Sequence, residues 1–179
     1  MADKQALREL QTRLARRMQQ VRSETPGQSW LAVDCAGQGL LMSLRQAGEI
    51  FDLSAMLPVP HTQPWLAGVV NLRGGVFTAI DLALFLGLRQ AHDAPAPREH
   101  VRLVAFNAAL GINAALMVDR LAGLRHAADL RREAAEAEAD NADTPGFALA
   151  RWSDAAGRSW QEIDLTALAR LPQFLAITD

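Results

Sequence analysis

Residues 64–82 read Pro64-Trp65-Leu66-Ala67-Gly68-Val69-Val70-Asn71-Leu72-Arg73-Gly74-Gly75-Val76-Phe77-Thr78-Ala79-Ile80-Asp81-Leu82. This stretch predicts a strand, a glycine turn and a second strand. In its first half, apolar Val70 and Leu72 share one face of the strand, and polar Asn71 and Arg73 share the other. The two glycines that follow supply the positive φ angles that a tight reversal needs. A strand that ends in an exposed guanidinium fork suits the binding of another protein better than the turnover of a substrate.

The composition is that of a globular chain with little net charge. Its 179 residues carry a formal net charge of −2, and 50% of them are hydrophobic. These values argue against nucleic-acid binding through a strong positive field and against global disorder. Cys35 is the one cysteine, so an internal disulfide and a cysteine-rich metal site are excluded. Because the chain has neither an apolar run near ~18 residues nor a secretory leader, we expect a cytoplasmic protein.

Residues 3–22 contain neither Gly nor Pro and predict an amphipathic helix that ends before Thr25-Pro26-Gly27. Its apolar stripe is about 80° wide and its other faces are basic. The stripe holds Leu7, Leu10, Leu14, Met18 and Val21. We expect this helix to pack on the protein's own barrel or on a neighbouring copy, through weak self-association. Contact with a partner or an anionic membrane is the alternative, without insertion into the membrane. We therefore predict a helical extension at 1–27 and one β domain at 28–179.

Short segments with period-two alternation predict many strands in the β domain. They are 29–35, 40–45, 49–56, 68–73, 76–82, 101–106, 112–119, 121–130, 147–152 and 159–163. The polar, proline-bearing stretch 90–97 is predicted to connect two lobes. Because no long crossover helix separates the strands, the pattern predicts a mainly β chain built from two small barrels.

A few short non-strand elements are also predicted. Residues 62–66 can form one helical turn, and 81–86 a short helix that ends before Gly87. Residues 165–171 predict a short C-terminal helix ended by Pro172. The acidic, alanine-rich stretch 133–143 has no apolar stripe, so we expect a solvated loop or a frayed helix.

The central motif resembles the signature of the CheW family, adaptor proteins that couple chemoreceptors to a histidine kinase. Residues 68–74 followed by 78–82 carry the resemblance, and 44–50 and 114–121 match two further family segments. Together these cover roughly residues 29–125. The resemblance implies a pair of small β subdomains and a non-catalytic protein without cofactor or metal. It also implies two partners, the cytoplasmic tip of a methyl-accepting chemoreceptor and a CheA-type kinase, at receptor arrays on the inner membrane or at a pole.

The same resemblance implies which residues bind partners. Glu49 and Arg73 match family positions associated with receptor and kinase coupling, and Leu44 and Ala47 match an apolar groove that accepts the receptor tip. Ala47 is small where the family usually has valine, which we expect to change the groove. The full predicted partner-binding set is Leu44, Ala47, Glu49, Ile50, Asn71, Leu72, Arg73 and Gly74.

Other features indicate one branch of the family. The basic segment 3–22, Pro64-Trp65 before the hairpin and the ending at 168–175 are more similar to PilI, the CheW-type adaptor of systems that control type IV pili and twitching motility. This similarity implies a role in pilus control, with flagellar control as the alternative.

Two other function classes remain open from the residues alone. A stand-alone β-barrel could bind a ligand or a nucleic acid, although the low net charge and the absence of tyrosine count against it. A hydrolase would need Cys35 as nucleophile, but Cys35 alternates with Leu31 and Val33 and is predicted to be a buried hydrophobe. The histidines are scattered without a ligand-like spacing, at His61, His92, His100 and His126.

Overall fold

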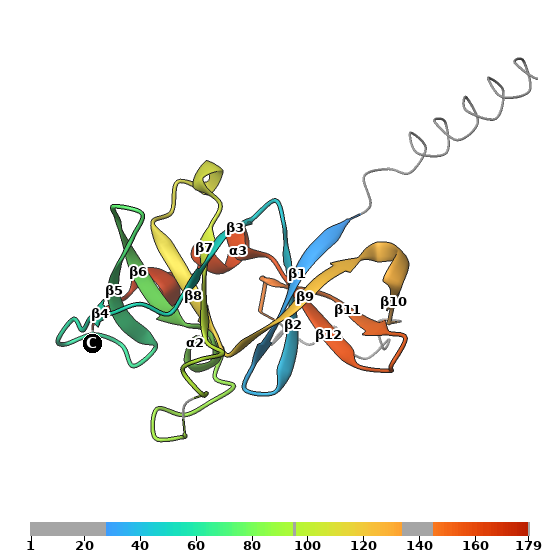
Figure 1. Cartoon of the computed structure of the whole chain (residues 1–179), viewed down its shortest axis with the longest axis horizontal. Helices are drawn as coiled ribbons and strands as arrows, with labels where there is room; N and C mark the ends of the chain where they lie inside the picture. Colours follow the sequence, from blue (N-terminus) through green and yellow to red (C-terminus); the bar gives the residue numbers. More distant parts are fainter. Residues whose placement is uncertain (1–27, 95, 134–144, 179) are drawn as a thin grey trace, which may run out of the picture.

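The computed structural model describes residues 28–94, 96–133 and 145–178. The predicted helix at 3–22 and most of the acidic stretch 133–143 lie outside these residues. The described chain forms two six-stranded sheets that lie side by side (Figure 1). This confirms the prediction of a mainly β, CheW-like pair of β subdomains with a short C-terminal helix.

Sheet A takes its strands from the two ends of the described chain, in the order β10-β11-β12-β2-β1-β9. These strands are β1 (Ser29–Cys35), β2 (Gln38–Ser43), β9 (Arg120–His126), β10 (Leu130–Arg132), β11 (Ala148–Asp154) and β12 (Ser159–Ile163). Sheet B takes the middle of the chain, in the order β3-β7-β8-β6-β5-β4. Its strands are β3 (Ala47–Asp52), β4 (Met56–Leu57), β5 (Leu66–Leu72), β6 (Gly75–Asp81), β7 (Arg102–Phe106) and β8 (Ala114–Val118).

The two edge strands of each sheet are consecutive in the chain. In sheet A, the edges β9 and β10 are joined by a single 3-10 turn, η2 (Ala127–Asp129). In sheet B, the edges β3 and β4 are joined by residues 53–55. A short link can join opposite edges only when the sheet curls toward closure, and curling reduces the exposed edge that would otherwise pair with another chain.

The predicted role of residues 90–97 was wrong. They join the β6–α2 segment to β7, and both β6 and β7 belong to sheet B, so they do not connect the two subdomains. The chain instead crosses between the sheets at residues 44–46 and at Asp119, the single residue between β8 and β9. Period-two alternation identifies a strand but carries no information on which sheet the strand joins, which explains the error.

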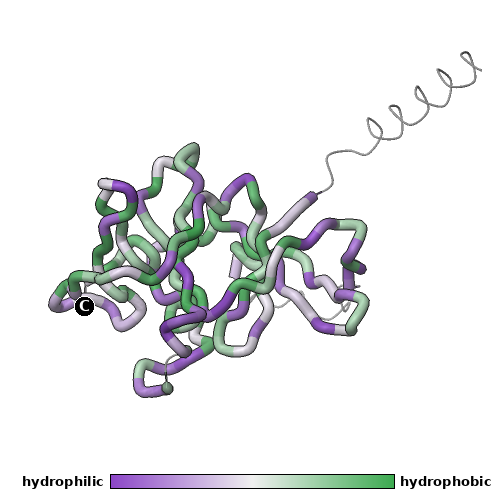
Figure 2. The backbone as a smooth tube through the Cα atoms, in the orientation of Figure 1, coloured by the Kyte–Doolittle hydropathy of each residue, from purple (hydrophilic) through white to green (hydrophobic). Residues whose placement is uncertain are grey.

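Side-chain alternation divides the apolar residues among three cores. On β1, Leu31, Val33 and Cys35 face a core shared with sheet B, whereas Trp30 and Ala32 face a core inside sheet A. Sheet B has its own inner core, which includes Val70 and Leu72 of β5. Strand β1 is therefore apolar on both faces, and the apolar segments of the chain lie mainly along the strands (Figure 2).

Short helices cover the shared core. Helix α2 (Leu82–Phe85) begins where the Asp81 carboxylate accepts a hydrogen bond from Leu84 N at 3.0 Å, and the chain turns at Gly87 with φ +69°. This confirms the predicted short helix. Residues 62–66 form a hydrogen-bonded turn, in which Leu66 N donates to Gln63 O at 2.9 Å.

The C-terminal part differs from the prediction at Pro172. Helix α3 (Leu165–Ala169) is capped by Asp164, and a second helix, α4 (Pro172–Leu175), begins at Pro172. Proline suits the first position of a helix because the N–H it lacks has no intrahelical partner there. Phe174 of α4 packs against Trp65, Phe85 and Phe106 with ring centroids 5.5–6.4 Å apart.

Candidate functional site

The central hairpin reverses at Arg73 and Gly74, one residue earlier than predicted. Leu72 pairs with Gly75, and the two loop residues have φ values of +49° and +82°. Two positive φ angles in a two-residue loop are typical of a type I′ turn, which matches the twist of the flanking strands. The Asn71 side chain accepts a hydrogen bond from Gly74 N at 2.9 Å and so stabilises the turn. Gly75 belongs to β6, so the paired glycines are not the turn.

Arg73 forms an ion pair with Glu49 of β3. Arg73 Nη1 lies 2.7 Å from Glu49 Oε1, and the two side chains are 75% and 50% exposed. Asp81, the carboxylate at the end of the same hairpin, is instead bound to Arg89 at 2.6 Å. The Glu49–Arg73 pair joins the hairpin tip to an edge strand that is not its neighbour in the sheet. Because both groups are accessible, the pair contributes little to stability and remains available to a charged partner.

A pocket of about 530 Å³ adjoins this pair. Glu49 lines it, together with Ala47 and a set of apolar and amide side chains from β3, β6, β7 and the β7–β8 loop. The remaining lining residues are Gly48, Phe51, Phe77, Ala105, Phe106, Asn107, Ala108, Ile112 and Asn113. The absence of a side chain at Gly48 allows β3 to approach β7, because a Cβ there would lie 2.8 Å from Phe106 O. The surface thus combines an apolar hollow with an exposed ion pair at its edge.

The segment before β3 is held by Gln46. Its side-chain Nε2 donates to Asp164 Oδ1 at 2.7 Å, and its Oε1 accepts from Leu165 N at 3.0 Å. Its backbone carbonyl accepts from Asn107 N at 2.8 Å. Gln46 therefore ties the entry to β3 to both the α3 cap and the pocket rim, which fixes the position of Ala47.

The eight predicted partner-binding residues occupy different environments. Leu44 and Ile50 are 41% and 42% exposed, and Ala47 is 6% exposed but borders the pocket. The sequence predicted Leu44 within the strand 40–45, but in the structure it lies in the turn after β2. Leu72 is only 5% exposed and packs in the inner core of sheet B, so its side chain supports the surface from beneath. The structure brings Glu49 and Arg73 into direct contact.

Several pocket residues were not predicted. Phe77 and Phe106 lie on strands β6 and β7, and Ile112 lies in the loop before β8. Their apolar character indicated only core positions. The pocket forms where β3 pairs with β7, and this pairing joins segments about 55 residues apart, so a local pattern does not reveal it. The partial exposure of Phe77 and Ile112 is a property of the fold.

The other residue considered for chemistry, Cys35, is a buried hydrophobe as predicted. It is 0% exposed, and burial together with the nearby Asp119 raises the pKa of its thiol to about 12. A thiol with this pKa is protonated at neutral pH and is a poor nucleophile. In the described residues, no cluster of three or more His, Cys, Asp or Glu side chains has a metal-binding arrangement. No helix in the same residues has the length and hydropathy needed to cross a membrane.

A family model described as the CheW-like domain matches residues 29–173, which include both sheets and the Glu49–Arg73 pair. The chain belongs to the CheW-like domain family. The prediction made from the central motif is thereby confirmed. The match begins at the first residue of β1 and extends into α4, so it covers nearly all of the described residues.

Relatives of both expected kinds are found. Protein PilI of Pseudomonas aeruginosa is 28% identical over 101 residues, which cover 55% of this chain and 54% of PilI. Chemotaxis protein CheW of Rhizobium meliloti is 32% identical over 79 residues, which cover 44% of this chain and 49% of that protein. The chain thus spans about half the length of the curated relatives it matches.

A solved structure shows the same fold. The scaffolding protein TtCheW from Thermoanaerobacter tengcongensis matches with a TM-score of 0.63 at 16% identity, over 82% of this chain and 90% of TtCheW. The agreement at this low identity concerns the CheW-like architecture, including the two subdomains.

Proposed function

We propose that this CheW-like chain is a non-catalytic adaptor that couples a methyl-accepting chemoreceptor to a CheA-type histidine kinase. The observation that carries the proposal is the Glu49–Arg73 pair beside the apolar pocket at Ala47, within a family whose relatives include chemotaxis proteins. The likeness to PilI supports control of type IV pili and twitching motility as the output. We place the protein in the cytoplasm, at receptor arrays on the inner membrane.

In this proposal the pocket receives apolar side chains from the helical tip of the receptor. Three phenylalanines, Phe51, Phe77 and Phe106, are among its lining residues. Ala47 is short, which leaves room in the pocket that a longer aliphatic side chain would fill. Burying apolar surface in a preformed hollow is the usual way in which a groove accepts an amphipathic helix.

Arg73 supplies the polar part of the recognition. Its planar fork can leave Glu49 and bind a partner carboxylate in the bidentate mode, and an arginine at the edge of an apolar pocket is a typical binding hot spot. Exchange of one exposed carboxylate for another costs little, since the existing pair is solvated. Asn71, Gly74 and Leu72 act indirectly, by holding the turn and the strand that present Arg73.

The pocket assignment is tested with a charge at its rim. Ala108 is exposed and lines the pocket, whereas the adjacent Ala109 is exposed and does not. Ala108→Arg should weaken binding of a soluble receptor-tip fragment at least tenfold and leave kinase binding unchanged, because a charge placed in an apolar contact must be desolvated without a partner.

Ala109→Arg is the matched control and should bind both partners as the unmodified protein does. Ala47→Arg is a less clear test, since Ala47 is 6% exposed and the substitution would also disturb the shared core. Equal receptor binding by the Ala108→Arg and Ala109→Arg proteins, measured by isothermal titration calorimetry, would show that the receptor does not use this pocket.

A further inference from the structure

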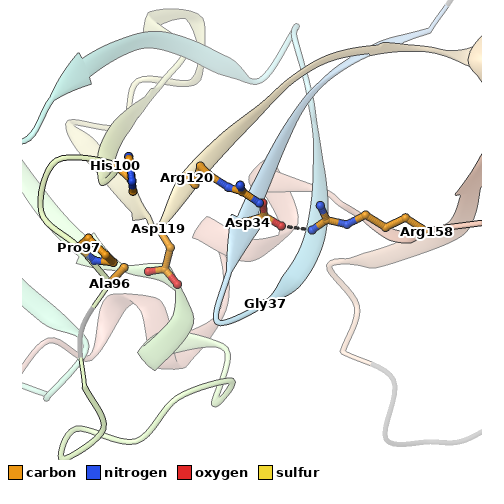
Figure 3. A pocket seen from close by; sticks show the side chains of 8 residues that line it. All are labelled: Asp34, Gly37, Ala96, Pro97, His100, Asp119, Arg120 and Arg158. Atoms are coloured by element: carbon orange, nitrogen blue, oxygen red, sulfur yellow. Dashed lines mark hydrogen bonds and ion pairs between the residues drawn. The ribbon is translucent and has the colours of Figure 1, made fainter. Parts of the chain in front are cut away.

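A second pocket, of about 510 Å³, lies where the β1–β2 turn approaches residues 96–100. It is lined by Asp34, Gly37, Ala96, Pro97, His100, Asp119, Arg120 and Arg158 (Figure 3). None of these residues lines the pocket at Ala47. Its volume is within the range of roughly 300–1,000 Å³ that is common for small-molecule sites.

Two arginines share one buried carboxylate in this pocket. Arg120 donates from Nε at 3.1 Å and from Nη2 at 2.6 Å to Asp34 Oδ2, and Arg158 Nη2 donates to Asp34 Oδ1. The two side chains reach Asp34 from opposite sides (Figure 3). Asp34 is only 5% exposed, so it holds both guanidinium groups from within the protein. Asp34 balances one of these two positive charges, and the second carboxylate of the pocket, Asp119, shares the single cation Arg89 with Asp81.

Both guanidinium groups keep free hydrogen-bond donors. An arginine side chain has five N–H groups, of which Arg120 uses two and Arg158 uses one within the described residues. The side chains are 62% and 35% exposed. Arg158 also lies over the ring of Trp160, 4.3 Å from its centroid, which fixes the plane of its fork. The unused donors are therefore held in place before any ligand arrives.

The acidic groups of the pocket are already engaged. Both oxygens of Asp34 accept from the two arginines, and Asp119 accepts from Arg89 Nη1 at 3.0 Å and from Ala36 N at 2.7 Å. Figure 3 shows His100 across the pocket from Arg158, near Ala96 and Pro97. His100 Nε2 lies 3.6 Å from the exposed carboxylate of Glu99. The groups free to bind a ligand are thus mainly N–H donors.

We propose that this pocket binds a phosphoryl group, held by the free N–H donors of Arg120 and Arg158. Guanidinium forks match the oxygens of phosphate in the bidentate mode, and a preorganised fork loses little entropy on binding. Ala96 and Pro97 form an apolar wall that can contact the organic part of a phosphorylated small molecule. The site is independent of the adaptor surface, so its test does not depend on the proposed function.

The test is isothermal titration calorimetry of the full chain at constant ionic strength, with inorganic phosphate, a sugar phosphate and a nucleoside monophosphate as probes. Saturable binding of one phosphate-bearing probe per chain is expected. Tighter binding of an organic phosphate would indicate a phosphorylated metabolite as the ligand, and equal or tighter binding of the inorganic ion would indicate free phosphate. If none of the three probes binds saturably, the proposal is wrong.

Matched variants connect binding to the pocket. Arg120→Gln should lower the affinity at least tenfold, and Arg120→Lys should restore only part of it, because a lysine keeps the charge but not the fork. Arg151→Gln removes the same charge from an exposed arginine that does not line this pocket, and it should bind like the unmodified protein. Equal losses of affinity for Arg120→Gln and Arg151→Gln would show that binding depends on the net charge of the protein and not on this pocket, and would overturn the assignment.

Discussion

Replacement of Arg73 by glycine should affect stability and partner binding in different ways. Arg73 occupies a left-handed conformation with φ +49°, which costs a residue other than glycine roughly 1–2 kcal/mol. Glycine removes that cost but adds about 0.4–1 kcal/mol of backbone freedom to the unfolded chain. Loss of the exposed pair with Glu49 removes roughly 0.2–1 kcal/mol. The free energy of unfolding of Arg73→Gly should therefore stay within about 1 kcal/mol of the unmodified value.

Arg73→Ala provides the comparison, because it loses the same ion pair and keeps the unfavourable φ angle. We expect the glycine variant to be more stable than the alanine variant by about 1 kcal/mol, or roughly 2–4 °C in melting temperature for a chain of this size. Chemical denaturation with urea, followed by tryptophan fluorescence, measures this difference directly. An alanine variant as stable as the glycine variant would contradict the type I′ turn.

Binding should change alike in both variants. If Arg73 is a hot spot, each variant should lose about 2 kcal/mol or more of binding free energy, which is roughly 30-fold in the dissociation constant for receptor or kinase. Arg98→Ala, at another exposed arginine, is the control and should leave binding unchanged. Unchanged partner binding by Arg73→Gly, together with a large loss of stability, would refute the assignment of Arg73 as a contact.

Three further predictions concern the interior. Cys35 should resist thiol reagents in the native state at pH 7–9. Its pKa of about 12 lies above the unfolded value near 9, so its contribution to stability is present below pH 9 and is lost between pH 9 and 12. A series of urea titrations at increasing pH would measure this loss. Arg89→Met should lower the free energy of unfolding by about 3 kcal/mol or more, because it leaves two carboxylates without their shared cation, and calorimetry can measure the loss. Glu162→Gln should cost about 1–3 kcal/mol in urea denaturation, since the Glu162 carboxylate accepts from the indoles of Trp30 and Trp152 and an amide nitrogen cannot.

The strands were largely predictable from the sequence because alternation is a local property. The predicted segment 29–35 coincides with β1, and 101–106 contains β7. The predicted strand 49–56 overlaps two strands, β3 and β4, at opposite edges of sheet B, and 121–130 contains most of β9, a 3-10 turn and the start of β10. These segments bend where the chain passes from one sheet edge to the other. Such bends depend on barrel closure, to which a local pattern is insensitive.

The candidate site was predictable only in part. The family-like motif identified Arg73 and Glu49 as a pair of interest, but their contact at 2.7 Å depends on the closure of sheet B. The partial exposure of Phe77 follows from the fold and could not be told from its apolar character, and Phe106 is a buried core residue that also borders the pocket. The second pocket was also missed, since Asp34, Arg120 and Arg158 come from separate strands and one hairpin loop.

The central claim is that this chain joins a receptor to a kinase, and reconstitution from purified components tests it most directly. Receptor-tip fragments displayed on vesicles, the kinase and the full chain would be mixed, and vesicle-bound kinase would be measured by sedimentation. The account predicts that little kinase sediments without the chain, that adding the chain increases the bound kinase several-fold, and that Arg73→Ala removes most of the increase. An amount of vesicle-bound kinase that is the same with and without the chain would contradict the account.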